Sequence, residues 1–468
     1  MSDEAARLGA WIERGVGGRV IRVTPLARWR PAWDVDVELD GHVLALHARG
    51  EREPRIVMPN RIADEVAVHD LLEAHGIPVP HAYGLCDDPY ALVMDRLSGH
   101  VDLSFAADDA ERSRVLDEYL GILARIYAIP LAAAAGAGFA LPGDSAATGL
   151  GGYWRRLEAQ YDRLMEGRPA DPVAEFLRRW MRDNVPPGRH AAARFIPYDA
   201  FQFMFDGGRV TGLIDFEHAH VGDPMMDLAA LRVRDTIKNI GELSDTAARY
   251  EKLTGVAIDH DVVEYHTVLY NAISVLSTGP PLADPLRGTD WLSYLAWYVN
   301  GARWAFECIA EIRGYRLAPV AVPEARPSRH APALRHLVNG LRALSAETDG
   351  DYELAGLGRV ANHLKRVDEV GAALDAADLE DLSRVLGYRP DPTEAEAELL
   401  TLVATAGPER EEELVRLLDA RMQRMHLAMA SPTSLMLRHP LLRSLRADRP
   451  TVRDPNDGWP AGAIPGTA

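Results

Sequence analysis

The residues that point most directly to chemistry lie in the stretch RVTGLIDFEHAHVGDPMMDLA, residues 209–229. Apolar Leu213 and Ile214 predict a short buried strand, which leaves Asp215 and Glu217 at its end. Carboxylate oxygens in such a position are the kind of ligand that Mg²⁺ binds. The simpler interpretations are a turn carboxylate at Asp215 and a solvated or helix-capping Glu217. The stretch predicts a metal-binding strand end.

Length and composition limit the classes of protein that remain. The chain has 468 residues, enough for two or three domains, and its 47% hydrophobic and 26% charged residues are typical of a globular protein. The net charge of −18 argues against a nucleic-acid partner, which would need a basic surface. It is compatible with a cationic small substrate, with solubility alone as the simpler interpretation. Cys86 and Cys308 are far apart and outside any metal spacing, so neither a disulfide framework nor a zinc site is expected.

The sequence shows no signal that would target the chain to a membrane or for secretion. Apolar runs are short and interrupted by charged residues, so no membrane span and no membrane partner are expected. Residues 1–15 are acidic and polar, unlike a secretory signal. We therefore expect a cytoplasmic protein.

The pattern of apolar residues changes along the chain. Residues 1–97 contain alternating, strand-length runs and one helix, expected from Arg61 to His75. Residues 98–315 have helical periodicity, interrupted by two short strands around the turn Gly207-Gly208. The sequence thus predicts an α+β fold with two lobes, a small β-rich N-lobe and a helical C-lobe.

Three further segments follow the two lobes. Residues 316–333 carry several prolines without periodicity and predict a linker. Residues 334–450 are rich in Leu, Ala, Glu and Arg and predict a C-terminal α-helical region. Residues 451–468 are rich in Pro and Gly and predict a flexible tail.

Two motifs connect this layout to a known family. EVAVHDLLEAHGIPVPHAYGLCDDPYALVMDRLSG, residues 65–99, and GDPMMDL, residues 222–228, resemble the aminoglycoside/choline phosphotransferase family, a branch of the protein-kinase-like fold. The resemblance implies phosphoryl transfer from ATP or GTP, with Mg²⁺, to a small-molecule substrate. It also implies metal ligation by Asp215, with Glu217 as a second carboxylate, and a structural, helix-capping role for Asp227.

The resemblance also identifies the nucleotide-binding residues. Glu65 matches the helix glutamate that orients a basic residue on the strand HVLALHARG. That strand has no lysine, so His47 and Arg49, which point to the same side, are the candidates, and Arg49 is favoured because it is always charged. Asp95 and Arg96 fall at the hinge, whose backbone would meet the adenine.

The catalytic segment departs from the family pattern. Pro197 stands where the catalytic aspartate is expected, and proline cannot accept a proton. Asp199, two residues later, is the candidate replacement, with an Asx-turn residue as the alternative. Gln202 stands at the position of the asparagine metal ligand and keeps an amide oxygen.

The phosphate-covering turn departs as well. It should be glycine-rich, but LARWRPAWDVDVEL, residues 26–39, has no glycine and carries Trp29 and Trp33. Those tryptophans are expected in the core, with stacking on an aromatic ligand as the alternative.

Three functions remain open from the sequence. The first is a phosphotransferase acting on the hydroxyl of a small molecule. An aminoglycoside-like acceptor is one possibility; the other is a hydroxyacyl-CoA, since the layout is similar to proteins associated with acyl-CoA dehydrogenase pathways. The second is a pseudokinase, or a non-phosphorylating enzyme, that binds a small ligand in the same place. The third is an interaction module, in which residues 334–450 bind a partner protein or a second copy of the chain.

Overall fold

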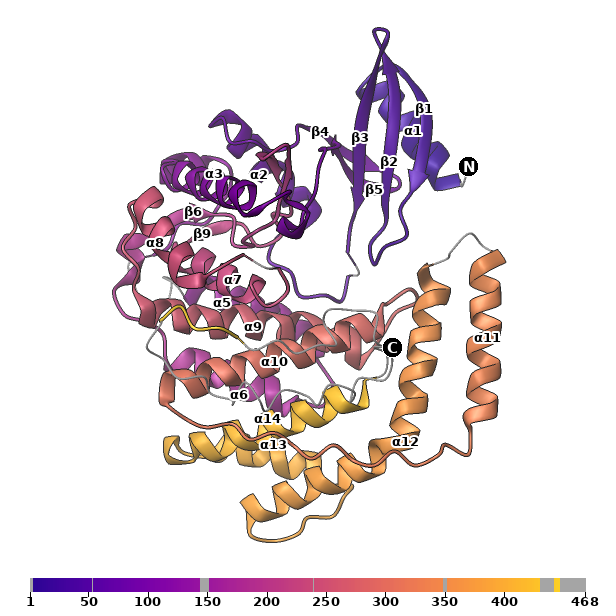
Figure 1. Cartoon of the computed structure of the whole chain (residues 1–468), viewed down its shortest axis with the longest axis vertical. Helices are drawn as coiled ribbons and strands as arrows, with labels where there is room; N and C mark the ends of the chain where they lie inside the picture. Colours follow the sequence, from indigo (N-terminus) through magenta and orange to yellow (C-terminus); the bar gives the residue numbers. More distant parts are fainter. Residues whose placement is uncertain are drawn as a thin grey trace. The chain divides into compact units, whose positions relative to one another are not determined.

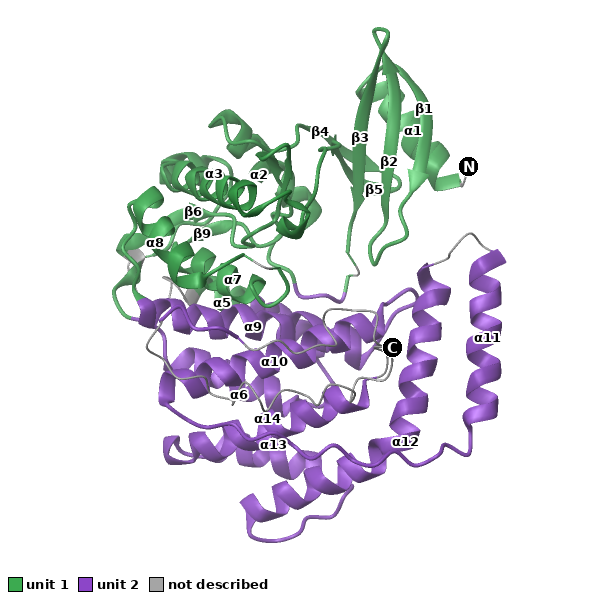
Figure 2. Ribbon diagram, in the orientation of Figure 1, with its two compact units in different colours: residues 1–54, 58–156, 187–259 green, residues 55–57, 157–186, 260–468 purple. Residues whose placement is uncertain are grey.

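A computed structural model describes residues 3–52, 54–143, 151–238, 240–347, 352–429 and 442–446. The described chain is a mixed α+β protein with an N-terminal sheet, a helical remainder and additional C-terminal helices, as predicted (Figure 1). It forms two compact units, coloured separately in Figure 2: residues 1–54, 58–156 and 187–259 in unit 1, and residues 55–57, 157–186 and 260–468 in unit 2. The predicted tail, residues 451–468, lies outside the described residues.

Unit 1 begins with a five-stranded antiparallel sheet in the order β1-β2-β3-β5-β4. Its strands are β1 (Arg19–Pro25), β2 (Ala32–Leu39), β3 (His42–Gly50), β4 (Ala82–Asp87) and β5 (Tyr90–Asp95). β1, β2 and β3 lie in the runs where apolar and polar residues alternate, and the predicted helix is α2 (Ile62–Ala74). The first helix, α1 (Asp3–Gly15), was not predicted.

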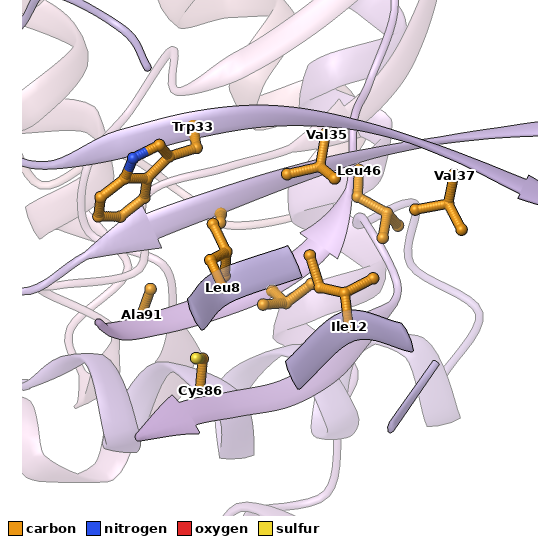
Figure 3. Close-up of a cluster of buried hydrophobic side chains, with 10 residues drawn as sticks. Leu8, Ile12, Trp33, Val35, Val37, Leu46, Cys86 and Ala91 are labelled. Carbon is orange, nitrogen blue, oxygen red and sulfur yellow. The ribbon is translucent and has the colours of Figure 1, made fainter. Parts of the chain in front are cut away.

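The two faces of the sheet bury different residues. One face packs on α1 through a core that also includes Trp33, which therefore packs as expected (Figure 3). On β3, Leu46 and Ala48 belong to that core, so by alternation Arg49 lies on the opposite face. That opposite face carries Leu92, which pairs with Arg49 in register and packs with α2. The pleat thus directs the Arg49 side chain toward α2.

The rest of unit 1 consists of helices and two small β-ribbons. The helices are α3 (Asp109–Tyr127), α4 (Leu131–Gly136), the start of α5 (Gly151–Met165), α7 (Met225–Arg234) and α8 (Leu243–Thr254). The strands are β6 (Arg194–Ile196), β7 (Phe203–Asp206), β8 (Arg209–Leu213) and β9 (His220–Gly222). β6 pairs with β9, and β7 with β8. The candidate catalytic segment, residues 197–202, therefore joins the two ribbons, as does the Asp215 segment.

Unit 2 is helical in its described residues. It contains the end of α5 and the helices α6 (Pro172–Asp183), α9 (His260–Ala283), α10 (Trp291–Arg313), α11 (Ala331–Glu347), α12 (Tyr352–Leu386), α13 (Ala395–Thr405) and α14 (Glu411–Ala428). α10 packs against α9, α12 and α14, whereas α11 pairs with α12 and has no buried residue. None of the described helices is long and apolar enough to cross a membrane.

Asp227 fixes the segment that leads into the candidate catalytic residues. Its Oδ1 accepts a hydrogen bond from the Tyr198 amide at 2.9 Å, and its Oδ2 accepts one from the Tyr127 hydroxyl at 2.9 Å. The helix-capping role that the resemblance implied for Asp227 belongs instead to Asp223, which accepts a bond from the Met225 amide at 2.9 Å. Burial raises the pKa of Asp227 to about 7.

Ile12 should be essential to the N-terminal sheet, because it is fully buried beneath the strands. We expect Ile12→Ala to lower the free energy of unfolding by about 2–5 kcal/mol. The matched control is Ile21→Ala on β1, where the side chain is 49% exposed and the loss should stay below about 1 kcal/mol. Urea unfolding measures both, and equal losses would contradict the packing of α1 on the sheet.

Asp227→Asn should change how stability depends on pH. The carboxyl group keeps its proton in the folded state up to about pH 7, whereas the unfolded chain releases it near pH 4. The wild-type protein therefore loses stability as pH rises from 4 to 7, and the asparagine variant avoids that loss. Relative to wild type, the variant should gain about 3 kcal/mol between pH 5 and pH 8.

Thermal unfolding at the two pH values measures this gain. Asp223→Asn is the control, because it removes the partner of Arg189 and should destabilise the protein at both. A pH-independent effect of Asp227→Asn would show that Asp227 is ionised in the folded protein at pH 5.

Candidate functional site

Arg49 and Glu65 form a buried ion pair between β3 and α2. Arg49 Nη1 donates to Glu65 Oε2 at 2.5 Å, and Glu65 is 1% exposed. Glu65 Oε2 also accepts a bond from the Phe216 amide at 3.2 Å, which connects α2 to the segment after β8. Burial is the main cause of the raised pKa of Glu65, and the Arg49 charge opposes it. The pair thus aligns an arginine whose second nitrogen is available to another anion.

That second nitrogen, Arg49 Nη2, contacts Asp215 Oδ1. Burial alone would raise the pKa of Asp215, but the charge of Arg49, followed by those of Arg30 and Arg52, lowers it far below its usual range. Asp215 is therefore a carboxylate at every ordinary pH. Its other oxygen, Oδ2, accepts a bond from Gln202 Nε2 at 3.0 Å, so two of the three residues predicted as metal ligands are in contact.

Gln202 also brings Asp199 into the same cluster. Its Nε2 donates to Asp199 Oδ2 at 3.0 Å, and Arg234 of α7 donates to both oxygens of Asp199, with Nη2 2.5 Å from each. The sequence predicted Asp199 as the base but gave no sign of Arg234. A carboxylate with these donors is firmly oriented, but it must give up one of them before it can accept a substrate proton.

The backbone of these loops is strained. Tyr198, Phe201 and Asp215 have φ values of 49°, 64° and 66°, in the left-handed region that residues other than glycine rarely occupy. Each such residue costs about 1–3 kcal/mol unless its surroundings fix it. The Tyr198 amide is fixed by Asp227, and the Phe201 amide donates to the Tyr119 hydroxyl at 3.1 Å. The strain thus coincides with the residues that carry the candidate chemistry.

Glu217 is surrounded by arginines. It is 4% exposed and contacts Arg30 Nη2, Arg52 Nη2 at 2.5 Å and Arg49 Nη2 at 3.1 Å. Arg30 belongs to the β1–β2 turn, where the family pattern has glycines. Trp29 of the same turn lies against two of these guanidinium groups. The centroid of its ring is 3.8 Å from Arg52 Cζ and 4.6 Å from Arg30 Cζ. The structure places Trp29 in this arginine cluster.

The cluster is close to electroneutral. Each of its four carboxylates contacts at least one of its four guanidinium groups; the members are Arg30, Arg49, Arg52, Arg234, Glu65, Asp199, Asp215 and Glu217. A kinase site with one basic residue would instead carry excess negative charge. A phosphate ligand is therefore as compatible with this cluster as a cation is.

Oxygen donors for Mg²⁺ are nevertheless present. Asp215 supplies a carboxylate, and Gln202 can supply its amide oxygen, because the two ends of an amide are interchangeable in a hydrogen-bond network. No group of three or more His, Cys, Asp or Glu side chains that could hold a metal occurs among the described residues. Two protein oxygens fit Mg²⁺ only when substrate phosphates complete its coordination, as is usual for this ion.

The remaining predicted residues lie apart from the cluster. His47 Nδ1 is 2.9 Å from Asp34, on the neighbouring strand β2. The Asp95 amide donates to the His81 carbonyl at 3.0 Å, and the Arg96 amide donates to the Ala45 carbonyl at 2.9 Å. Both hinge N–H groups are thus engaged and cannot donate to an adenine as they stand.

His218 lies in the same loop as Asp215 and Glu217. Its Nδ1 is 2.7 Å from the Tyr153 hydroxyl, and burial lowers the pKa of His218 to about 4. The imidazole is therefore neutral near pH 7. His220 stacks on Tyr153 with ring centroids 4.1 Å apart, so both histidines pack with Tyr153.

Comparison with solved structures finds antibiotic-modifying enzymes. A macrolide 2'-phosphotransferase from Brachybacterium faecium is 19% identical, with 60% of this chain and 98% of that chain covered and a TM-score of 0.39. An aminoglycoside phosphotransferase from Streptomyces rimosus, in complex with ADP and streptomycin, is 16% identical, with 59% and 99% covered and a TM-score of 0.40. These low scores leave the family assignment to the sequence.

The sequence comparison is more specific. No curated protein matches the chain. The model of the phosphotransferase enzyme family matches residues 51–263, a range that includes Glu65, Asp199, Gln202, Asp215 and Glu217. Residues 51–263 therefore match the phosphotransferase enzyme family, within a chain of mixed α+β structure.

Proposed function

We propose that unit 1 binds a nucleoside triphosphate, ATP or GTP, and transfers its terminal phosphoryl group to the hydroxyl group of a small molecule. The observation that supports this most strongly is the meeting of Arg49 and Gln202 at one carboxylate, Asp215. A phosphate-contacting cation and two metal-ligand oxygens are then positioned together. Phosphoryl transfer depends mainly on such positioning and on charge neutralisation.

Each residue has a distinct part in this proposal. Arg49, aligned by Glu65, binds the phosphate oxygens. Asp215 and the amide oxygen of Gln202 would hold Mg²⁺, which supplies charge neutralisation at the phosphates. Glu217 is directed toward arginines, so we leave it out of the metal ligands.

The transfer itself joins the acceptor oxygen to the terminal phosphorus and breaks the bond from that phosphorus to the bridging oxygen. The products are a nucleoside diphosphate and a phosphate monoester, and Asp199 takes the hydroxyl proton. Asp199 Oδ2 is now bonded to Gln202 Nε2. If Gln202 turned its Nε2 away, that bond would be lost and Oδ2 would keep only the donor from Arg234, which leaves it an acceptor position for the hydroxyl group.

A second candidate is a protein of the same fold that binds a ligand without phosphorylation. The contact between Arg234 and both oxygens of Asp199 favours it, because donors already occupy both oxygens that would have to accept the hydroxyl proton. Pro197, at the position of the family's catalytic aspartate, has no side-chain group that could accept the proton instead. The two candidates differ in whether bound nucleotide is consumed.

Asp215→Asn should abolish nucleotide binding that depends on Mg²⁺. Asparagine tolerates the left-handed backbone at this position, so the variant should fold. At about 100 times Kd, Mg-ATP or Mg-GTP should stabilise the wild-type protein by roughly 2.7 kcal/mol, a shift visible in thermal unfolding. The control is Asp206→Asn, an exposed carboxylate of β7 that should retain the shift. No shift in the wild-type protein would refute the proposal.

Asp199→Asn should separate transfer from binding. It should lower phosphoryl transfer about 10²–10⁴-fold, because the base is lost, while the shift with Mg-nucleotide persists. Release of nucleoside diphosphate, measured with hydroxylated acceptors that include aminoglycosides and hydroxyacyl-CoA compounds, reports the rate. A wild-type protein that binds Mg-nucleotide but never consumes it would support the second candidate.

A further inference from the structure

Three arginines converge on the carboxylate of Glu217. Glu217 Oε1 alone contacts Arg30 Nη2, Arg52 Nε at 2.6 Å and Arg49 Nη2 at 3.1 Å. Arg30 is 4% exposed, and its Nε has no hydrogen-bond partner among the described residues. A buried N–H without an acceptor is costly, so an additional anionic oxygen would be favourable here.

The local fold holds these arginines in place. The Gly50 amide, at the end of β3, donates to the Pro31 carbonyl at 2.8 Å. A Cβ at Gly50 would come within 2.9 Å of that carbonyl oxygen, so only glycine permits this approach of the turn. Trp29 lies against the guanidinium groups of Arg30 and Arg52 and restricts their orientation. The arginines are therefore preorganised.

Arg49 connects this group to the site of the proposed reaction. It contacts Glu217 at 3.1 Å and also touches Asp215. An anion that replaced the Glu217 carboxylate would therefore lie next to the groups assigned to nucleotide phosphates. A phosphate has more acceptor oxygens and more negative charge than a carboxylate, and it suits the planar fork of arginine.

We propose that Arg30 and Arg52, backed by Trp29, form a phosphate-binding subsite that Glu217 occupies as an internal carboxylate until a phosphate group displaces it. The subsite takes the place of the glycine-rich turn and uses guanidinium groups where that turn uses backbone amides. The inference rests on the proposed function only for the identity of the ligand, a phosphate of the nucleotide or of the acceptor.

The test uses inorganic pyrophosphate, titrated into the full-length protein without Mg²⁺ at low salt and followed by calorimetry. Arg30→Gln and Arg52→Gln should each weaken binding roughly tenfold or more, the loss expected for a charge-assisted hydrogen bond. Glu217→Gln should strengthen binding, because it removes the competing carboxylate. Arg28→Gln is the matched control: it removes the same charge from the same turn, but Arg28 is exposed and should leave binding unchanged.

A phosphate subsite predicts opposite changes in pyrophosphate affinity for the arginine variants and for Glu217→Gln, whereas a purely structural ion-pair cluster does not. If Glu217→Gln weakens binding as the arginine variants do, or if Arg30→Gln and Arg52→Gln bind like wild type, the inference is wrong. If Arg30→Gln fails to fold, Arg52→Gln and Glu217→Gln still give opposite predictions. Circular dichroism shows which variants are folded.

Two further titrations identify the ligand and separate this inference from the proposed function. ADP that competes with pyrophosphate assigns the subsite to nucleotide phosphates, and ADP that binds together with pyrophosphate assigns it to a phosphate of the acceptor. Pyrophosphate binding that depends on Arg30, in a protein that transfers no phosphoryl group, would support the subsite while refuting the proposed reaction.

Discussion

The contact of one guanidinium group with two carboxylates determines the arrangement of unit 1. Arg49 comes from β3, Glu65 from α2 and Asp215 from the end of β8, so three separate elements are fixed at one point. The buried carboxylate of Glu65 and the half-buried carboxylate of Asp215 would repel each other without it, and a buried arginine would be unstable without them. The position of α2, the charge of Asp215 and the approach of Gln202 all depend on this contact.

The same region stores backbone strain that the surrounding fold must offset. Tyr198, Phe201 and Asp215 have positive φ values, and buried hydrogen bonds hold the amides of Tyr198 and Phe201. Asp227, whose pKa is raised by burial, accepts one of these bonds from the Tyr198 amide. Strain that is so well supported is typical of functional segments, where the conformation of a few side chains matters more than local stability.

Sequence patterns were informative wherever local periodicity controls the structure. The alternation of β3 correctly put His47 and Arg49 on one side, and the apolar spacing of α2 gave its limits within a residue or two. The helix α1 was missed, because its apolar stripe is short and lies in an acidic segment. The ribbon of β6 and β9 was missed because each strand has only three residues.

Long-range partners could not be predicted. Arg30 and Glu217 are 187 residues apart, and nothing in a single sequence connects them. Arg234, the partner of Asp199, lies in a helix whose apolar pattern gives no reason to select it. One signal was present. The turn that should contain glycines reads RWRPAW, residues 28–33, and its Arg30 could have been considered as a phosphate ligand.

The central claim is that phosphate groups bind among the arginines next to Asp215. A crystal structure of the full-length protein with a non-hydrolysable ATP analogue and Mg²⁺ would test it most directly, through the positions of the phosphorus atoms. The account predicts the terminal phosphates in hydrogen-bond contact with Arg49 and with Arg30 or Arg52, and the Glu217 carboxylate displaced. Phosphates bound elsewhere, with Glu217 still enclosed by its arginines, would contradict it.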